Sequence, residues 1–450
     1  MYSKKRRTPL IVLLCFLCVV LAGLGWYVVD TNWDRSGWVE KDGIYSYRDF
    51  HGRKITGWLE VDGWKYYFRE DASMATGWLE LDGSTYHLGT DGTLDLGWIA
   101  EGEDRYYSGS DGSIRTGWQD IDFQRYFFAD SGKLCTGWLE QTEGTYHLGA
   151  DGAMSLGFVT VEDSTYYFAE DGRMHTGPLV LGEDSYLFTQ DGTQYTGWLE
   201  DEDSARYYDP QTGILLTGWQ QIDGSLYYLG EDGLRQTGWL ELGEYRYYLH
   251  PDGTAAVGPT EIDGSTYYFT PKGIHVVLVN TRNKVPGYYK MELVTVQDWH
   301  RVSSVCLEPL KRMLADCKAA GISYTFNSAY RSIAEQQEIL SKRTQEYEEQ
   351  GMDGNAAYAK ARQTVALPGT SEHHLGLAVD LLGQEAIQWL GRHCWEYGFI
   401  LRYTADKEHI TGFVDEPWHF RYVGTEVSLE LKDSGLCLEE YLGAWTETDE

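Results

Sequence analysis

Residues 371–380 read SEHHLGLAVD and residues 416–424 read EPWHFRYVG, and these two stretches decide the fold of the C-terminal part of the chain. Two histidines and one carboxylate are the usual three protein ligands of a catalytic zinc, with the fourth position left for water. We assign His373, Asp380 and His419 to the metal. Glu416 is a further carboxylate outside this ligand set, and we expect it to act as the general base. The pattern therefore indicates hydrolytic chemistry.

Alternation around the first motif predicts a strand that carries Asp380. In residues 376–382, small or polar side chains alternate with leucine and valine, which is the period of a half-buried strand. Asp380 therefore points away from the core. His373 has the wrong parity to follow on that strand, so we expect it to reach the metal from the turn that begins at 368–369.

The second motif predicts a strand that begins after a proline. Pro417 cannot donate a hydrogen bond to a central ladder, and the residues beyond it alternate between aromatic and other side chains. This alternation directs His419 toward the site and Trp418 toward the core. Glu416 then lies on the loop just before the strand, where it is free to reach a water at the metal.

These residues resemble the VanY-type D-alanyl-D-alanine carboxypeptidases, zinc enzymes that trim the stem peptide of bacterial peptidoglycan. The resemblance covers residues 276–450. The family pattern Ser-x-His-x-x-Gly-x-Ala-x-Asp is met from Ser371 to Asp380, and Glu-Pro-Trp-His is met at 416–419. Weaker agreements are LVNTRNKVP at 278–286, YGFILRY at 397–403 and LEEYL at 438–442.

The resemblance also implies a substrate-binding set. SAYRSIAEQ at 328–336 is similar to the family's Tyr-Arg-Ser segment, which implies that Arg331 and Gln336 hold the terminal carboxylate and amide of the substrate. Ser371 and Trp418 complete this set. An exopeptidase must recognise a free carboxylate, and a guanidinium matches it with two parallel hydrogen bonds, so Arg331 joins Glu416 as a catalytic residue. His374 falls at a variable position of the pattern, and we expect it not to coordinate.

A repeat fills the N-terminal half of the chain. A glycine recurs every 20 residues from Gly37 to Gly197 and, after one 21-residue step, from Gly218 to Gly258. Tryptophan follows most of these glycines, and an aromatic pair such as Tyr66-Tyr67 comes next, followed by an Asp-Gly turn. An aromatic strand, that turn and a second short strand would make one β-hairpin per repeat. Stacked hairpins predict a β-solenoid of about 11 or 12 units over residues 36–275.

These units resemble the cell-wall-binding repeats of the choline-binding and glucan-binding type. Choline cages in that family use the Gly-Trp tryptophan and another aromatic residue just before the tyrosine pair. Here that second position is never aromatic in the repeats compared: Lys65, Thr85, Arg105, Arg125, Thr145, Thr165, Arg206, Leu226 and Arg246. The tryptophan itself is replaced at Phe158, Pro178 and Pro259. We therefore favour a wall glycan or teichoic polymer as the ligand, or a plain spacer.

The charge of the chain excludes nucleic acid and anionic lipid surfaces as expected partners. The formal net charge is −32. Residues 30–275 carry 43 acidic and 16 basic side chains, and residues 276–450 carry 26 and 17. Both parts would repel nucleic acid and anionic lipid, whereas toward wall teichoic phosphates the acidic repeats would either repel them or gather divalent cations near them.

The N-terminus predicts a membrane anchor. Residues 1–9, a basic tail that contains Lys4, Lys5, Arg6 and Arg7, would stay in the cytoplasm, and residues 10–29 would span the bilayer as an uncleaved signal anchor. A signal peptide cleaved after Ala22 is the alternative. Everything beyond would lie outside the cell, against the wall. Five cysteines lie there, too few and too scattered for a disulfide scaffold.

Between the motifs the C-terminal domain is expected to be α+β, with helices at 306–321, 332–351 and 384–398 and a strand at 322–330. The whole chain is then multidomain: a membrane anchor, a hairpin solenoid at 36–275 and a zinc peptidase at 276–450. We expect a D,D-carboxypeptidase that removes terminal D-alanine from stem peptides. An L,D-carboxypeptidase, a D-Ala-D-Ala dipeptidase, and a wall-binding surface protein with secondary peptidase activity remain alternatives.

Overall fold

The computed structural model describes residues 35–201 and 204–445. They form two compact units, one that ends at Tyr195 and one that begins at Thr196. The tail expected at 1–9 and the span expected at 10–29 lie outside the described residues. Among the residues that are described, no helix has the length and apolar character needed to cross a membrane.

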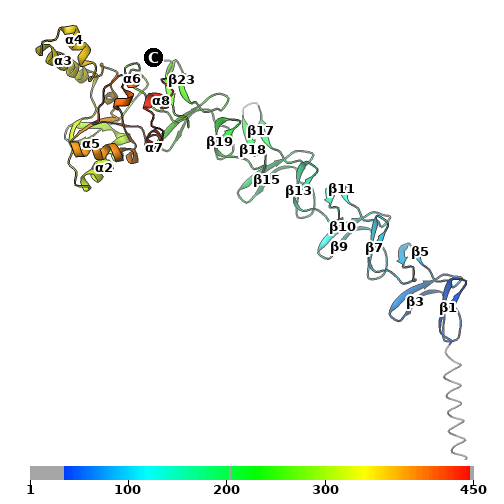
Figure 1. Ribbon diagram of the computed structural model, residues 1–450. Helices are drawn as coiled ribbons and strands as arrows, with labels where there is room; N and C mark the ends of the chain where they lie inside the picture. The colour runs from blue at the N-terminus through cyan, green and yellow to red at the C-terminus, as the bar shows by residue number, and fades with distance from the viewer. Residues whose placement is uncertain (1–34, 202–203, 446–450) are drawn as a thin grey trace, which may run out of the picture. The chain divides into compact units, whose positions relative to one another are not determined.

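Each repeat folds into one antiparallel β-hairpin, as predicted (Figure 1). In the first unit the paired strands are β1 (Gly37–Lys41) with β2 (Ile44–Arg48), β3 (Gly57–Val61) with β4 (Trp64–Phe68), β5 (Gly77–Leu81) with β6 (Ser84–Leu88), β7 (Gly97–Glu101) with β8 (Asp104–Ser108), β9 (Gly117–Ile121) with β10 (Gln124–Phe128), β11 (Gly137–Gln141) with β12 (Gly144–Leu148), β13 (Gly157–Val161) with β14 (Ser164–Phe168), and β15 (Gly177–Leu181) with β16 (Asp184–Phe188). The second unit opens with β17 (Gly197–Glu200) and β18 (Ala205–Tyr208), β19 (Gly218–Ile222) and β20 (Ser225–Leu229), β21 (Gly238–Leu242) and β22 (Tyr245–Leu249), and β23 (Gly258–Ile262) and β24 (Ser265–Phe269).

The hairpin turn precedes the tyrosine pair, so the predicted strand order within a repeat was wrong. In the second repeat the turn is Asp62-Gly63, with φ of 53° and 82°, and it joins the Gly-Trp strand to the aromatic strand. Positive φ at both central residues is the signature of a type I′ hairpin turn. The Asp-Gly that follows the pair, such as Asp91-Gly92, closes a separate loop that is held by an isolated bridge from Leu88 to Leu94.

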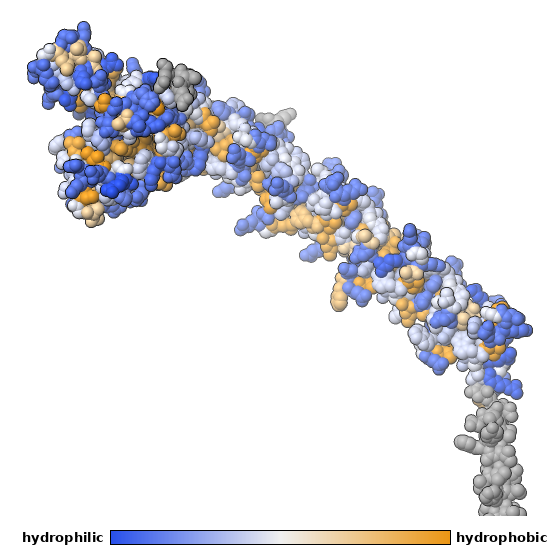
Figure 2. Space-filling view, in the orientation of Figure 1, coloured by the Kyte–Doolittle hydropathy of each residue, from blue (hydrophilic) through white to orange (hydrophobic). Residues whose placement is uncertain are grey.

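Neighbouring repeats of the first unit share their aromatic core. The Trp58 ring lies 5.1 Å from Tyr67 of its own hairpin and 5.1 Å from Tyr86 of the next. The backbone N–H of Leu94 donates to the carbonyl of Lys65 one repeat earlier, at 2.8 Å. Each hairpin is thus completed by its neighbour. Some apolar side chains stay at the surface of the hairpins (Figure 2), and Phe123 is fully exposed.

The rest of the second unit is α+β, as expected. Its elements are β25 (Leu293–Gln297), β26 (His300–Ser303), α2 (Ser304–Ala319), β27 (Thr325–Ser328), α3 (Ile333–Glu349), α4 (Gly354–Ala361), η1 (Glu372–Leu375), β28 (Ala378–Leu382), α5 (Gln384–His393), η2 (Cys394–Tyr397), β29 (Phe399–Leu401), η3 (Ala405–Lys407), α6 (Glu408–Thr411), β30 (His419–Tyr422), α7 (Thr425–Ser434) and α8 (Leu438–Tyr441). Four strands form a sheet in the order β27-β28-β30-β29. The cysteines of the described residues are all free.

Two apolar clusters hold the second unit together. One packs the buried face of α2 and of α5 against the sheet, through residues such as Leu310, Leu390 and Val379. The other joins the last repeats to α7 and α8, where Tyr247 and Ile274 pack with Leu438. Because of this second cluster, the second compact unit includes the last repeats. The domain boundary expected between residues 275 and 276 remains a prediction from sequence.

Candidate active site

Two neighbouring strands and a short helix bring the predicted ligands together. Asp380 on β28 is the register partner of His419 on β30. His373 comes from η1, which ends at Gly376 in the left-handed region, at φ 67°. A Cβ on Gly376 would lie 2.9 Å from the backbone nitrogen of Ser303. Both the positive φ and this close approach therefore require glycine where η1 turns into β28.

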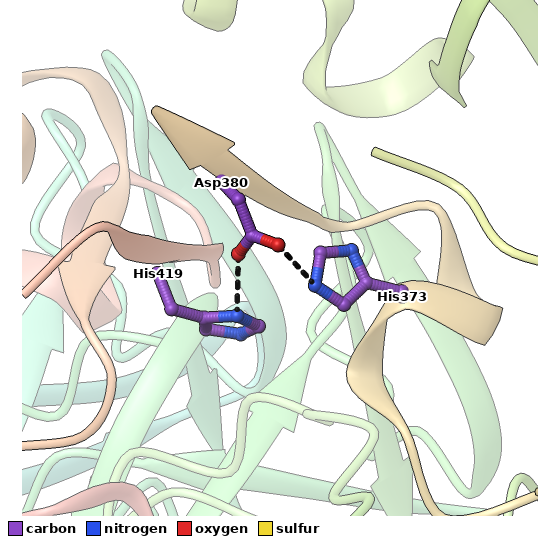
Figure 3. Close-up of side chains that lie close together, drawn as sticks. All are labelled: His373, Asp380 and His419. Atoms are coloured by element: carbon purple, nitrogen blue, oxygen red, sulfur yellow. Dashed lines mark hydrogen bonds and ion pairs between the residues drawn. The ribbon is translucent and has the colours of Figure 1, made fainter. Parts of the chain in front are cut away.

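The three side chains converge on one point (Figure 3). His373 Nε2 lies 3.3 Å from Asp380 Oδ2, and His419 Nδ1 lies 3.0 Å from Asp380 Oδ1. One ligand atom from each residue falls within 4.8 Å of the others, and all three residues are buried. The two imidazoles supply nitrogen and the aspartate supplies oxygen, which is a donor set that suits zinc.

A cationic side chain, that of Arg331, contacts two of the three residues. Arg331 Nη2 lies 2.7 Å from His373 Nε2 and 2.7 Å from Asp380 Oδ2, so a guanidinium nitrogen stands where donor atoms would bind a metal ion. His373 Nδ1 lies 2.6 Å from the carbonyl oxygen of Ala329, to which only an N–H can donate. The Nε2 lone pair is then free for a cation. The contact with Ala329 therefore fixes the tautomer of His373 that metal binding requires.

The pKa values of the ligands differ because their surroundings differ. Burial, together with the charge of Arg331, lowers the pKa of His373 to about 4. Burial alone would also lower the pKa of His419, but hydrogen bonds to Asp380 and Glu372 raise it to about 9. Although burial would raise the pKa of Asp380, His373 and His419 hold it well below the usual value. A metal would therefore displace a proton from His419.

Glu416 lies beside the cluster without joining it. Its Oε2 is 4.0 Å from His419 Nδ1, and the residue is 9 % exposed. Burial raises the pKa of Glu416 to about 7, despite the opposing charge of His419. A carboxylate with a pKa near neutrality can both accept and return a proton, as a general base must.

The other predicted site residues line the same cleft of about 530 Å³. Arg331 is fixed by Ser328 Oγ at 2.7 Å and by Gln336 Oε1 at 3.1 Å, and Gln336 is fully buried. Ser371 is buried at the wall of the cleft. Trp418 is half-buried there as well, so its predicted place in the core was wrong: β30 begins only at His419, and the alternation does not extend back to Trp418.

His374 is hydrogen-bonded outside the three-residue cluster. Its Nε2 accepts from the Gly369 N–H at 3.0 Å, and its Nδ1 lies 2.7 Å from the carbonyl oxygen of Arg331. Both ring nitrogens are therefore occupied.

Sequence reasoning missed Tyr403, whose ring lies 5.0 Å from His419 and lines the cleft, and Glu372, which lies within hydrogen-bonding distance of His419. Tyr403 stands in the YGFILRY stretch, which gave no chemical signal beyond the family resemblance.

Family models match both parts of the chain. The model described as D-alanyl-D-alanine carboxypeptidase (VanY) matches residues 299–425. The choline-binding repeat model matches residues 55–94 and 216–258, and a putative cell wall binding repeat model matches residues 157–174.

Relatives agree with these matches. A D-alanyl-D-alanine carboxypeptidase of Enterococcus faecalis is 40 % identical over 174 residues, which cover 37 % of this chain and 65 % of the relative. A putative carboxypeptidase, YodJ, of Bacillus subtilis is 32 % identical over 189 residues, 37 % of this chain and 66 % of the relative. The chain thus spans just under two thirds of the length of these two relatives.

Among solved structures, a zinc-bound variant of the vancomycin-resistance D,D-pentapeptidase VanY is 40 % identical and has a TM-score of 0.36, with 37 % of this chain and 97 % of that chain covered. Because both family models match, the chain carries a peptidase domain of the VanY D-alanyl-D-alanine carboxypeptidase family, joined to repeats of the choline-binding type.

Proposed function

We propose that this protein is a zinc-dependent D,D-carboxypeptidase that removes the terminal D-alanine from peptidoglycan stem peptides. The observation that supports this most is the placement of a two-histidine, one-aspartate cluster, a carboxylate of raised pKa and a guanidinium in a single cleft. These are the groups that hydrolysis of a C-terminal peptide bond requires. When bound by His373, Asp380 and His419, zinc would supply Lewis acidity toward the scissile carbonyl and the attacking water.

The residues of the chain perform the remaining tasks. Glu416 takes the proton from the attacking water and returns it to the leaving amine. Arg331 holds the terminal carboxylate of the substrate. Arg331 Nη2 lies 2.7 Å from His373 Nε2 and 2.7 Å from Asp380 Oδ2. The guanidinium of Arg331 therefore stands beside the residues that would hold zinc, where its planar fork can offer two parallel donors to a carboxylate.

We also propose that the repeats bind a wall glycan or teichoic polymer rather than choline. In five repeats a cationic side chain of the protein lies over a tryptophan ring: Lys65 over Trp58, Arg105 over Trp98, Arg125 over Trp118, Arg235 over Trp198 and Arg246 over Trp239, at 3.8 to 5.3 Å from the centroid. A quaternary ammonium would need the same ring face. The chain's own cations therefore compete with choline.

Residues 10–29 would anchor this enzyme in the membrane, with the peptidase outside and at the wall.

One relative supports an alternative substrate. A relative in Enterococcus gallinarum, 44 % identical over 104 residues, 20 % of this chain and 54 % of the relative, is described as both a D-Ala-D-Ala dipeptidase and a D-Ala-D-Ala carboxypeptidase. The free dipeptide is therefore a second candidate substrate.

Mass spectrometry of defined muropeptides tests the proposal. The zinc-loaded protein should remove one alanine from a pentapeptide that ends in D-Ala-D-Ala, and a chelator should abolish this. Glu416→Gln should lower kcat about 1,000-fold or more, since both proton transfers are lost. Glu385→Gln, a change at an exposed residue, is the matched control and should leave the rate unchanged.

Cleavage of the tetrapeptide alone would indicate L,D specificity, and cleavage of the free dipeptide alone would indicate a dipeptidase. Cleavage of none would leave wall binding as the function.

A further inference from the structure

Glu372 lies directly behind the metal-binding cluster and is 1 % exposed. Its Oε2 is 3.4 Å from His419 Nε2, while the other ring nitrogen, Nδ1, faces Asp380 at 3.0 Å. The His419 ring is thus held between two carboxylates, one on the side of the ligand set and one on the opposite side. Among the hydrogen bonds of the described residues, Glu372 is the partner of Nε2, and none of the residues assigned above to catalysis or substrate binding contacts this nitrogen.

Two buried arginines hold Glu372 in place. Its Oε1 accepts from Arg402 Nε at 2.8 Å and from Arg421 Nη1 at 2.9 Å. The side chains of Arg402 and Arg421 are 0 % and 1 % exposed. Solvent therefore does not screen these contacts. The carboxylate of Glu372 is held by three donors, which are the two guanidinium groups and the imidazole.

The network continues into segments outside the region 299–425 that the family model matches. Arg402 Nη2 donates to Glu439 Oε1 at 2.6 Å, and Arg402 Nη1 donates to Glu439 Oε2 at 3.0 Å. Glu439 is on α8, and it also accepts from Asn280 Nδ2 at 3.0 Å. Arg421 Nη2 donates to the carbonyl oxygen of Val277 at 2.8 Å. Two glutamates balance two arginines, so the buried set is neutral overall.

This arrangement has the form of a carboxylate, histidine and metal triad. A carboxylate that accepts from the distal N–H of a ligating histidine fixes the tautomer and the ring direction, and it raises the basicity of the ligating nitrogen. In His419 the distal nitrogen is Nε2, so a proton held there by Glu372 leaves Nδ1 for the metal. The same device is provided for His373 by the carbonyl oxygen of Ala329.

We propose that Glu372 is the positioning residue for His419 as a metal ligand, and that Glu439 on α8 supports it through Arg402. The proposal rests on the zinc site put forward above. The proposal extends the support of the metal centre beyond residues 299–425, the region that the family model matches. This support includes α8 and the segment that contains Asn280. The closing LEEYL stretch then has a physical role, because it carries Glu439.

Zinc affinity of the full-length protein tests the proposal without an activity assay. Zinc is titrated at pH 7 in competition with a chromophoric chelator. Glu372→Gln should weaken zinc binding about 10- to 100-fold, the usual effect of losing such a partner. Glu439→Gln should weaken it less, about 3- to 10-fold, because it acts through Arg402. Glu385→Gln, an exposed glutamate on α5, should bind as wild type does.

If folded Glu372→Gln binds zinc with the same affinity as wild type, within twofold, the role proposed for Glu372 is overturned, whereas the proposed function stands. If wild type binds no zinc, or if His373→Ala binds it as tightly, the proposed function fails as well.

Glu372→Gln leaves one buried arginine charge without compensation, because Arg402 keeps Glu439 whereas Arg421 loses its carboxylate partner, so the variant can fail to fold. A measurement on the wild-type protein removes this dependence. In ¹⁵N-resolved imidazole spectra of the zinc-loaded protein, His419 should carry its proton on Nε2, and this proton should exchange slowly with solvent. A proton that exchanges at the solvent-limited rate, or a proton on Nδ1, would contradict the assignment of Glu372.

Discussion

At the scale of single residues, the pKa of Glu416 predicts how the rate depends on pH. Burial raises this pKa from 4.5 to about 7, and the base acts only in its ionised form. The value of kcat/KM should therefore fall as the pH drops below about 7, approaching tenfold per pH unit. A bound cation favours the ionised form and would shift this limb lower. The measurement is kcat/KM on a D-Ala-D-Ala peptide from pH 4.5 to 8 at saturating zinc.

An acid limb with the same midpoint in wild type and in Glu416→Gln would remove Glu416 from the role of base. Residual activity of Glu416→Gln serves as the control, and it should lack this limb. A limb that persists in the variant would report loss of metal from protonated His419 instead, since that group also titrates.

The sequence predicts the residues that the chemistry requires by type and spacing. His373, Asp380, His419 and Glu416 stand at fixed positions in two motifs, and the structure brings them to one cleft. The supporting residues have no such signal. Glu372 contacts His419, 47 residues away along the chain, and Arg402 contacts Glu439, 37 residues away. Buried ion pairs of this kind depend on the tertiary fold, and arginine and glutamate are ordinarily surface residues.

At the scale of elements, Gly376 decides how η1 meets β28. Gly376→Ala adds a Cβ at φ 67°, 2.9 Å from the Ser303 nitrogen, and should destabilise the protein by about 1–3 kcal/mol. His373 would shift with η1, so zinc affinity should fall too. The matched control is Gly391→Ala within α5, where no atom apart from the adjoining residues and the helix's own backbone lies within 4 Å of the added Cβ, and it should stabilise the protein by about 1 kcal/mol.

Urea unfolding of both variants with the metal-free protein checks this prediction. If Gly376→Ala is as stable as wild type, the chain at this corner tolerates a side chain, and the close approach to Ser303 is not a constraint.

The repeats show what periodicity cannot decide. It predicts one hairpin per 20 residues but not which Asp-Gly forms the hairpin turn, because both kinds of turn carry the same dipeptide. The choice is made by pairing: the strands on either side of Asp62-Gly63 align residue for residue, from Gly57 with Phe68 to Val61 with Trp64. The fifth repeat even tolerates Phe123 at φ 65° in place of the glycine. Strand register therefore outweighs the preference of one turn residue.

At the scale of the whole molecule, a change in sequence pattern does not mark where the chain can be divided. The repeat pattern ends near residue 275, yet the compact unit begins at Thr196. Within that unit, Tyr422 Oη donates to Glu244 Oε2 at 2.9 Å, and Tyr245 Oη accepts from the Glu426 N–H at 3.1 Å. A pattern reports how each segment folds locally, whereas such contacts between segments emerge only in the tertiary structure.

This packing predicts that residues 276–450 alone are less stable than residues 196–450. Removing the last repeats would uncover Val427, Leu438 and Leu442, each 0 % exposed in a cluster with Tyr247. Exposure of an apolar side chain costs about 1.5–3 kcal/mol, so the fragment should lose about 5 kcal/mol and unfold at lower denaturant concentration. Fluorescence-detected urea unfolding of both fragments measures this. Equal midpoints would show that the cluster adds nothing, and the peptidase would then be independent of its repeats. A lower midpoint with zinc affinity retained would separate the packing of α7 and α8 from the support that Glu439 gives to the metal centre.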